Sequence, residues 1–222
     1  MISYQVQRNN RSRNLRLRIT SAAQVIVSAP PRISDQTIAR FVEQHMDWII
    51  KNQSKIKARK KIVDEDAVMV FGTQYKKIID TPEKTLHKHP VYIRDQYIHI
   101  RPVTQTTSSV NRTLETFLKT TAQKYIIPRT QQLAKTMDIR FTSLTLRDQK
   151  TRWGSCSSNG GLNFNWRLVQ YPTAVIDYVI VHELAHRREM NHSAKFWAIV
   201  AKFDPEYKAH RKWLQKYGST VE

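Results

Sequence analysis

The stretch His182-Glu183-Leu184-Ala185-His186 decides both the fold and the chemistry that this sequence predicts. On a helix, residues four apart lie one above the other, so both imidazoles can reach one metal ion. Glu183 stands one step round the same helix, where its carboxylate can contact a water molecule on that metal. A Lewis acid, a water and a base together make a hydrolytic centre, and we expect one here.

The residues before the motif predict the buried helix that it requires. Pro172 precedes it, and proline suits the first turn of a helix. Two apolar ridges then follow at helical spacing, formed by Val175 and Val179 and by Ile176, Ile180 and Leu184. Two imidazoles and a carboxylate are costly to bury without partners, and a bound metal removes most of that cost. This setting weakens the other reading, a chance match of two core histidines and a surface glutamate.

His192 is the best candidate for a third ligand, because a catalytic zinc usually takes three protein ligands and one water. The string from His182 to His192 has the ligand spacing of metzincins, although Glu189 stands where those enzymes have Gly. Asn191 tolerates the left-handed conformation that ends helices, and Ser193 is a typical N-cap of a following helix. His192 would then face the metal from the corner between two helices. The alternative is a polar turn residue without a ligand role.

Cys156 is the rival third ligand, since it is the only cysteine of the chain. Peptide deformylases also pair a distant cysteine with a helix of this kind, so a deformylase-like zinc amidase stays open. The other reading of Cys156 is a small buried thiol beside the site. Glu189 is a weaker candidate, because gluzincins take their later glutamate from a separate helix.

Further blocks of sequence accompany the motif along nearly the whole chain. Those near it are RWGSCS at 152–157, LNF at 162–164, VHELAH at 181–186, NHS at 191–193 and FW at 196–197. Those nearer the amino terminus lie at 16–19, 25–27, 30–31, 41–42 and 48–49. This ordered set resembles the YgjP-like metallopeptidases, which are related to the SprT-like and WLM zinc proteases. The resemblance implies that His182, His186 and His192 bind one zinc ion per chain and that Glu183 is the catalytic residue.

Cysteine content and hydropathy bound the compartment. A single cysteine permits no internal disulfide, which fits a reducing cytoplasm. The first residues show no apolar signal core, and no apolar run is long enough to cross a bilayer. We therefore expect a cytoplasmic protein with no membrane partner.

The charge is strongly basic, with 37 Lys and Arg against 18 Asp and Glu and a net charge of +19. Residues 1–63 hold 13 basic and 3 acidic side chains, whereas residues 64–107 hold six of each. A polyanion such as nucleic acid or nucleoprotein is a natural partner for a protein with this positive charge. A charge that only keeps the protein soluble explains the excess of Lys and Arg equally well. The candidate nucleic-acid contacts are Arg11, Arg13, Arg16 and Arg18.

The pattern of elements predicts an α+β protein of two domains. Short alternating runs predict a small, strand-rich, basic α+β domain over residues 1–107, ending in a polar linker at 104–109. Residues 108–222 predict a zincin-like metallopeptidase domain, in which helices pack on a small sheet and the motif helix lies in the core. Within it, Leu162, Asn163 and Phe164 are the candidate for the sheet edge beside that helix, where a peptide substrate can add as a strand. The alternative is an ordinary core strand.

Together these features predict zinc-dependent hydrolysis of peptide bonds with Glu183 as general base. The expected substrate is a peptide or protein, and proteins bound to nucleic acid are candidates. The alternative from another class is a nucleic-acid-binding protein in which zinc only organises the fold. Glu183 favours the enzyme, because a structural zinc site closes its fourth position with a ligand and needs no base.

Overall fold

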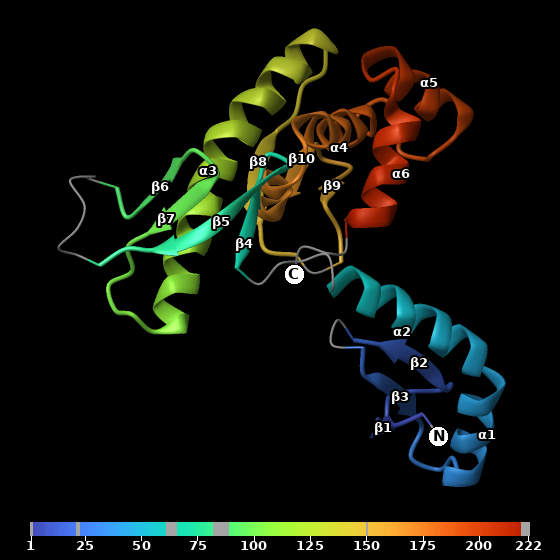
Figure 1. Ribbon diagram of the computed structural model, residues 1–222. Coiled ribbons are helices and arrows are strands. Elements are labelled where there is room, and N and C mark those ends of the chain that lie inside the picture. The colour runs from blue at the N-terminus through green and yellow to red at the C-terminus, as the bar shows by residue number, and fades with distance from the viewer. Residues whose placement is uncertain (1, 21–22, 61–65, 82–88, 150, 219–222) are drawn as a thin grey trace. The chain divides into compact units, whose positions relative to one another are not determined.

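The computed structural model describes residues 2–20, 23–60, 66–81, 89–149 and 151–218, with the backbone alone for 55–60 (Figure 1). It divides into two compact units, residues 1–64 and residues 65–221. In this part of the chain, no helix is both long and apolar enough to span a membrane.

The first unit is a three-stranded sheet with two helices. Its elements are β1 (Tyr4–Arg8), β2 (Arg16–Ile19), β3 (Val25–Ala29), α1 (Asp35–Gln44) and α2 (Met46–Lys60). The central strand β3 pairs with β1 in parallel and with β2 antiparallel. The core beneath the sheet joins Val25 and Val27 to Ile38, Val42 and Ile49 of the helices. Helix α1 begins where the Ser34 side chain accepts a hydrogen bond from the Thr37 amide.

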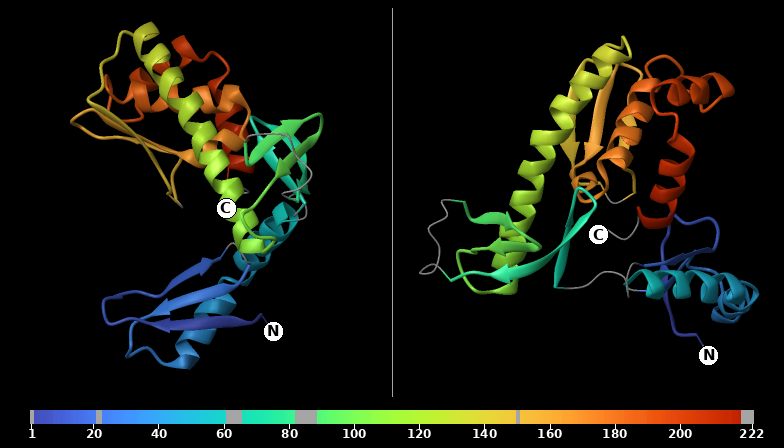
Figure 2. Two further views of the ribbon diagram at one scale, coloured as in Figure 1. Left: turned by 90° about the vertical axis from the view of Figure 1, so that its left-hand side faces the viewer. Right: turned by 45° about the horizontal axis from the view of Figure 1, so that its top comes forward.

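The second unit begins with a four-stranded sheet on a long helix. Its strands are β4 (Ala67–Val70), β5 (Thr73–Ile79), β6 (Val91–Arg94) and β7 (Tyr97–Ile100), in the order β4-β5-β7-β6, and the helix is α3 (Thr107–Thr136). Val91, Ile98 and Ile100 share one hydrophobic core with Val110 and Leu114 of α3. Two views of Figure 2 show this sheet beside the first half of the helix.

Residue 107, after which the sequence predicts a domain boundary, is the first residue of α3 and lies within the second unit. The polar residues at 104–109 lead into this helix: Thr106 is its N-cap, and the Thr106 side chain accepts a hydrogen bond from the Ser109 amide. Serine and threonine suit helix caps as well as linkers, so composition alone does not separate the two roles. The structure instead divides the chain between residues 64 and 65.

The rest of the second unit surrounds the motif helix. It contains β8 (Ser143–Arg147), β9 (Gly154–Cys156), β10 (Gly161–Asn165), the 3₁₀ helix η2 (Trp166–Gln170), α4 (Thr173–Ala185), α5 (Ala194–Phe203) and α6 (Tyr207–Tyr217). Helix α4 carries the motif and is buried on nearly all sides, as the apolar ridges predict. The chain is thus an α+β protein whose amino-terminal part, before the motif helix, is rich in strands, as expected.

An ion pair joins α3 to α4 across this core. Arg129 donates from Nε to Asp177 Oδ1 at 2.9 Å and from Nη2 to Asp177 Oδ2 at 2.6 Å. Two parallel, charge-assisted hydrogen bonds fix the two side chains more firmly than a single contact does. This pair therefore helps to hold the helix that carries the motif.

Candidate metal centre

Three histidines meet at the end of α4. His182 lies in the last turn of the helix, His186 is its C-cap residue, and His192 comes from the segment before α5. The Nε2 atoms of His182 and His192 are 3.0 Å apart, and one nitrogen of each ring lies within 4.8 Å of the others. In the described part of the chain, this group includes neither Cys156 nor Glu189.

The corner that carries His192 forms as the local signals predict. The chain leaves α4 through a turn in which the Glu189 amide still bonds the Ala185 carbonyl. Helix α5 then begins where the Ser193 side chain accepts from the Phe196 amide. The His192 ring stacks on Trp197, with ring centres 5.7 Å apart. These contacts turn the third imidazole towards the other two.

Each of the two helix imidazoles has a nitrogen to offer a metal. His186 Nδ1 lies 3.2 Å from the Glu189 carbonyl oxygen. Because a carbonyl only accepts, this contact places the proton on Nδ1 and leaves a lone pair on Nε2. His182 Nδ1 is buried with no hydrogen-bond partner among the described residues, while its Nε2 faces His192.

Burial favours the neutral form that metal ligands need in two of the histidines, His182 and His186. Burial lowers the pKa of His182 to about 3, and the neighbouring His186 and His192 act in the same direction. Burial also lowers the pKa of His186. Neutral imidazoles grouped around one point are a donor set typical of zinc and related divalent ions. The residues therefore fit a metal ion.

Glu183 is a buried carboxyl group beside this cluster. It is only 7% exposed, and burial raises its pKa to about 7, against the opposing charge of Arg152. A carboxyl group with a pKa near neutrality can both take and return a proton. The arrangement can thus combine a metal ion with an acid–base group on one helix.

Cys156 is a half-buried thiol near Glu183, outside the histidine group. Its Sγ contacts the Ser157 carbonyl at 3.5 Å. Burial raises its pKa, which the charge of Arg187 partly offsets and that of Glu183 reinforces. Cys156 is thus a half-buried thiol beside the histidine group.

The predicted substrate edge at Leu162, Asn163 and Phe164 needs correction. These residues belong to β10, the central strand of the order β8-β10-β9. Strand β10 pairs with β8 on one side and with β9 on the other, and Leu162 and Phe164 are buried. Its backbone therefore has no free edge for a peptide. The edge strand that contacts α4 is β9.

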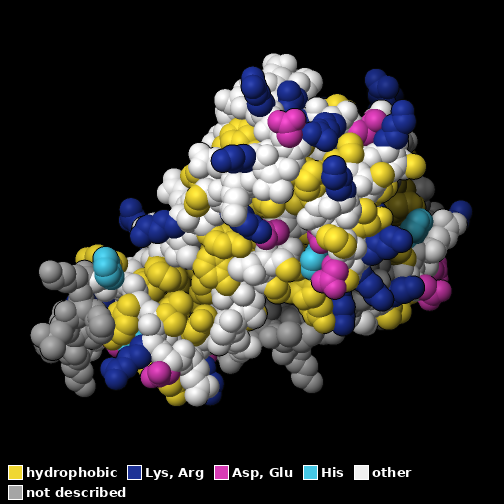
Figure 3. All heavy atoms as spheres, turned by 90° about the horizontal axis from the view of Figure 1, so that it is seen from above, with side chains coloured by type: hydrophobic (Ala, Val, Ile, Leu, Met, Phe, Trp, Pro, Cys, Tyr) yellow, Lys and Arg dark blue, Asp and Glu magenta, His cyan; other side chains and the backbone are white. Residues whose placement is uncertain are grey.

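The four predicted nucleic-acid contacts lie in the first unit, whereas the histidines lie in the second. Arg16 and Arg18 are exposed and alternate along β2 with the inward Leu17 and Ile19. Arg18 also donates to the Gln7 side chain at 3.2 Å. Arg11 and Arg13 are exposed in the loop before β2. On the face drawn in Figure 3, Lys and Arg are spread over the surface and do not gather in one patch.

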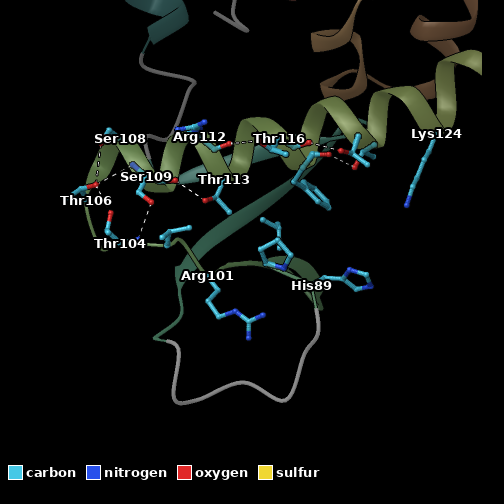
Figure 4. A pocket seen from close by; sticks show the side chains of 16 residues that line it. His89, Arg101, Thr104, Thr106, Ser108, Ser109, Arg112, Thr113, Thr116 and Lys124 are labelled. Atoms are coloured by element: carbon cyan, nitrogen blue, oxygen red, sulfur yellow. Dashed lines mark hydrogen bonds between the residues drawn. The ribbon is translucent and has the colours of Figure 1, made fainter.

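A pocket of about 910 Å³ lies between α3 and the loops beside β6 and β7 (Figure 4). It contains none of the predicted site residues. His89, Arg101, Arg112 and Lys124 line it, together with hydroxyl groups. Thr113 and Thr116 donate their hydroxyl protons to backbone carbonyls of α3, and the basic side chains point in separate directions. Converging groups, which a binding site needs, are therefore missing among the described residues here.

A polar pair lies next to the centre. His210 is partly buried on α6, and its Nδ1 lies 2.9 Å from Asp204 Oδ2. The ring of Tyr178 lies near both His210 and His182. The ring centres are 6.5 Å apart for Tyr178 and His210 and 5.9 Å apart for Tyr178 and His182. The packing of α6 on α4 brings these residues together, and no local spacing in the sequence signals it.

The chain is similar to known metallopeptidases. A family model described as the YgjP-like metallopeptidase domain matches residues 13–217. No curated protein matches the chain. The zymogen of Pyrococcus abyssi abylysin, a metallopeptidase, is 20% identical, with a TM-score of 0.38 over 42% of this chain and 95% of that one. The zymogen of Methanocaldococcus jannaschii jannalysin is 22% identical, with a TM-score of 0.37 over 41% and 95%. Since the family model spans most of the sequence, the chain belongs to the YgjP-like metallopeptidases and is a protease.

Proposed function

We propose that this protein is a zinc-dependent peptidase in which His182, His186 and His192 hold one zinc ion and Glu183 is the general base. The observation that carries the proposal is the group of three imidazole nitrogens within 4.8 Å, with the buried Glu183 carboxyl on the same helix. A zinc ion bound there supplies a Lewis acid and lowers the pKa of its water to about 7.

The side chains of the chain divide the remaining work. Glu183 accepts a proton from the attacking water and then delivers it to the leaving amine, so that one carboxyl group serves both halves of the reaction. The Glu189 carbonyl holds the His186 ring in the tautomer and orientation of a ligand. The rings of Phe196 and Trp197 pack on His192 and orient its imidazole.

We further propose that the substrate is a peptide or protein that lies extended along β9. This strand is the edge of its sheet, and it contacts the helix that carries His182 and Glu183. In the described part of the chain, its outer side carries no partner strand. An extended peptide can hydrogen-bond to such an edge and present its backbone carbonyl to the site.

Removal of the metal tests the zinc assignment. Chelation should abolish peptide hydrolysis, and one equivalent of zinc per chain should restore it, because Glu183 alone is a weak catalyst without a Lewis acid. The measurement is cleavage of an unbiased peptide mixture, read by mass spectrometry, with elemental analysis of the same samples. Full activity in protein shown to be metal-free would contradict the proposal.

Nucleic acid is a second, separate proposal for a partner, supported by the net charge of +19 and by the outward Arg16 and Arg18. Binding to DNA or RNA should weaken linearly on a log–log scale as salt rises, because bound phosphates release counterions. Replacing Arg16 and Arg18 together by Gln should weaken binding and flatten this slope.

Replacing the exposed Lys208 and Lys212 of the second unit by Gln is the matched control, since it removes the same charge elsewhere. Fluorescence anisotropy at several salt concentrations makes the measurement. A salt-independent signal, or equal losses in both double variants, would remove the proposal for these arginines.

A further inference from the structure

Gly154 is a glycine that its backbone conformation does not require. It begins the edge strand β9 and pairs with Phe164 of β10. Gly72 and Gly160 have φ angles of +80° and +86°, which favour glycine, whereas Gly154 lies outside this left-handed region. Inside a strand, glycine is a weak choice, and it often marks a place where another group approaches the backbone closely.

The group that approaches Gly154 is the Glu183 side chain. A Cβ atom at position 154 would lie 2.7 Å from Glu183 Cγ, 2.7 Å from Oε1 and 2.9 Å from Cδ. All three distances are shorter than the contacts that real Cβ atoms make. The carboxyl group of Glu183 therefore rests directly against the backbone of β9.

Glu183 has little room to avoid an added methyl group. The residue is 7% exposed, and the residues on its face one turn earlier in α4, Val179 and Ile180, are buried as well. In a tightly packed interior, an added methyl group displaces the side chain with which it overlaps. Here that side chain is the acid–base group itself.

We infer that Gly154 is a positioning residue: the absence of a side chain at this point sets where the Glu183 carboxyl stands relative to the three imidazoles. The inference rests on the proposed role of Glu183 as general base. Strand β9 then has two roles: it aligns the proposed substrate, and it positions the Glu183 carboxyl group.

Gly154→Ala should leave zinc content unchanged and lower kcat by about a hundred-fold, the cost typical of a displacement of about 1 Å at a catalytic group. KM should change little, because the substrate still meets the backbone of β9. Gly161→Ala in β10 is the matched control: its Cβ would crowd the Ser143 and Ser157 hydroxyls at 3.0 and 3.1 Å, away from Glu183. We expect it to keep kcat.

A double-mutant cycle separates positioning from a general defect. In a Glu183→Gln background the base is already absent, so Gly154→Ala should lower the residual activity no further. An equal fold loss in both backgrounds, or full kcat in Gly154→Ala alone, would overturn the inference. A fully active Glu183→Gln enzyme would instead overturn the proposed function, so the two failures are distinct.

A stability measurement covers the case in which Gly154→Ala does not fold. Glu183→Ala removes the three atoms that the new methyl group would meet. The double variant Gly154→Ala/Glu183→Ala should then fold with the melting temperature of Glu183→Ala. If the double variant also fails to fold, the methyl group meets something other than Glu183 and the inference is wrong.

Discussion

Replacing Glu183 by Gln should leave zinc bound and lower kcat by about a thousand-fold, within the range that general acid–base catalysis contributes. The amide of Gln has nearly the same shape as the carboxyl group, but it cannot take the proton of the attacking water. Metal binding should persist, because the three candidate ligands are imidazoles. Steady-state kinetics on a cleaved peptide, with elemental analysis of the same protein, makes the measurement.

Glu115→Gln is the control for this substitution. Glu115 lies on α3, where it forms an exposed pair with Lys119, and its replacement removes the same charge. Such a surface pair contributes little to stability, so the variant should behave as the parent protein. Wild-type turnover in Glu183→Gln would exclude the proposed mechanism, whatever the metal content.

Replacing His192 by Ala should release most of the zinc, whereas replacing Cys156 by Ala should retain it. His192 Nε2 lies 3.0 Å from His182 Nε2 within the histidine group, and the thiol of Cys156 lies outside that group. Loss of a direct ligand should weaken binding more than the roughly 10–100-fold that an outer partner of a ligand contributes. Competition with a chromophoric chelator measures both affinities.

The same pair of variants decides between the sequence-based readings. Zinc retained by His192→Ala and lost by Cys156→Ala would favour the deformylase-like ligand set. If both variants keep zinc and Glu189→Ala loses it, the third ligand would be the glutamate. Either result would contradict the ligand set proposed here.

The motif helix and its following corner could be predicted because their signals are local. The apolar spacing of Val175 to Leu184 predicts a buried helix, and α4 is buried as expected. Ser193 predicts the start of the next helix, and its side chain caps α5. Since His192 stands directly before this cap, its place near the other imidazoles follows from residues close to it in sequence.

The arrangement of strands around α4 could not be predicted in the same way. The pattern of Leu162 and Phe164 shows a buried strand, but it does not say which strands pair with it. Strand β10 is central because β8 and β9 flank it, and β8 lies earlier in the chain as a parallel neighbour. The edge role therefore falls to β9, whose three residues give almost no periodic signal.

The contact between Gly154 and Glu183 could not be predicted from local sequence either. The two residues lie far apart in sequence, and the glycine is informative only once the place of a missing Cβ is known. The limit between the two compact units was also missed, because the polar residues at 104–109 cap α3. Tertiary contacts, more than local propensity, fix these features.

The most direct test of the three-histidine zinc site is a crystal structure of zinc-loaded protein, with anomalous diffraction recorded on both sides of the zinc absorption edge. We expect one zinc peak per chain, at about 2.0–2.1 Å from one nitrogen each of His182, His186 and His192. A peak held by other residues, or no peak between these three rings in protein that contains stoichiometric zinc, would contradict it.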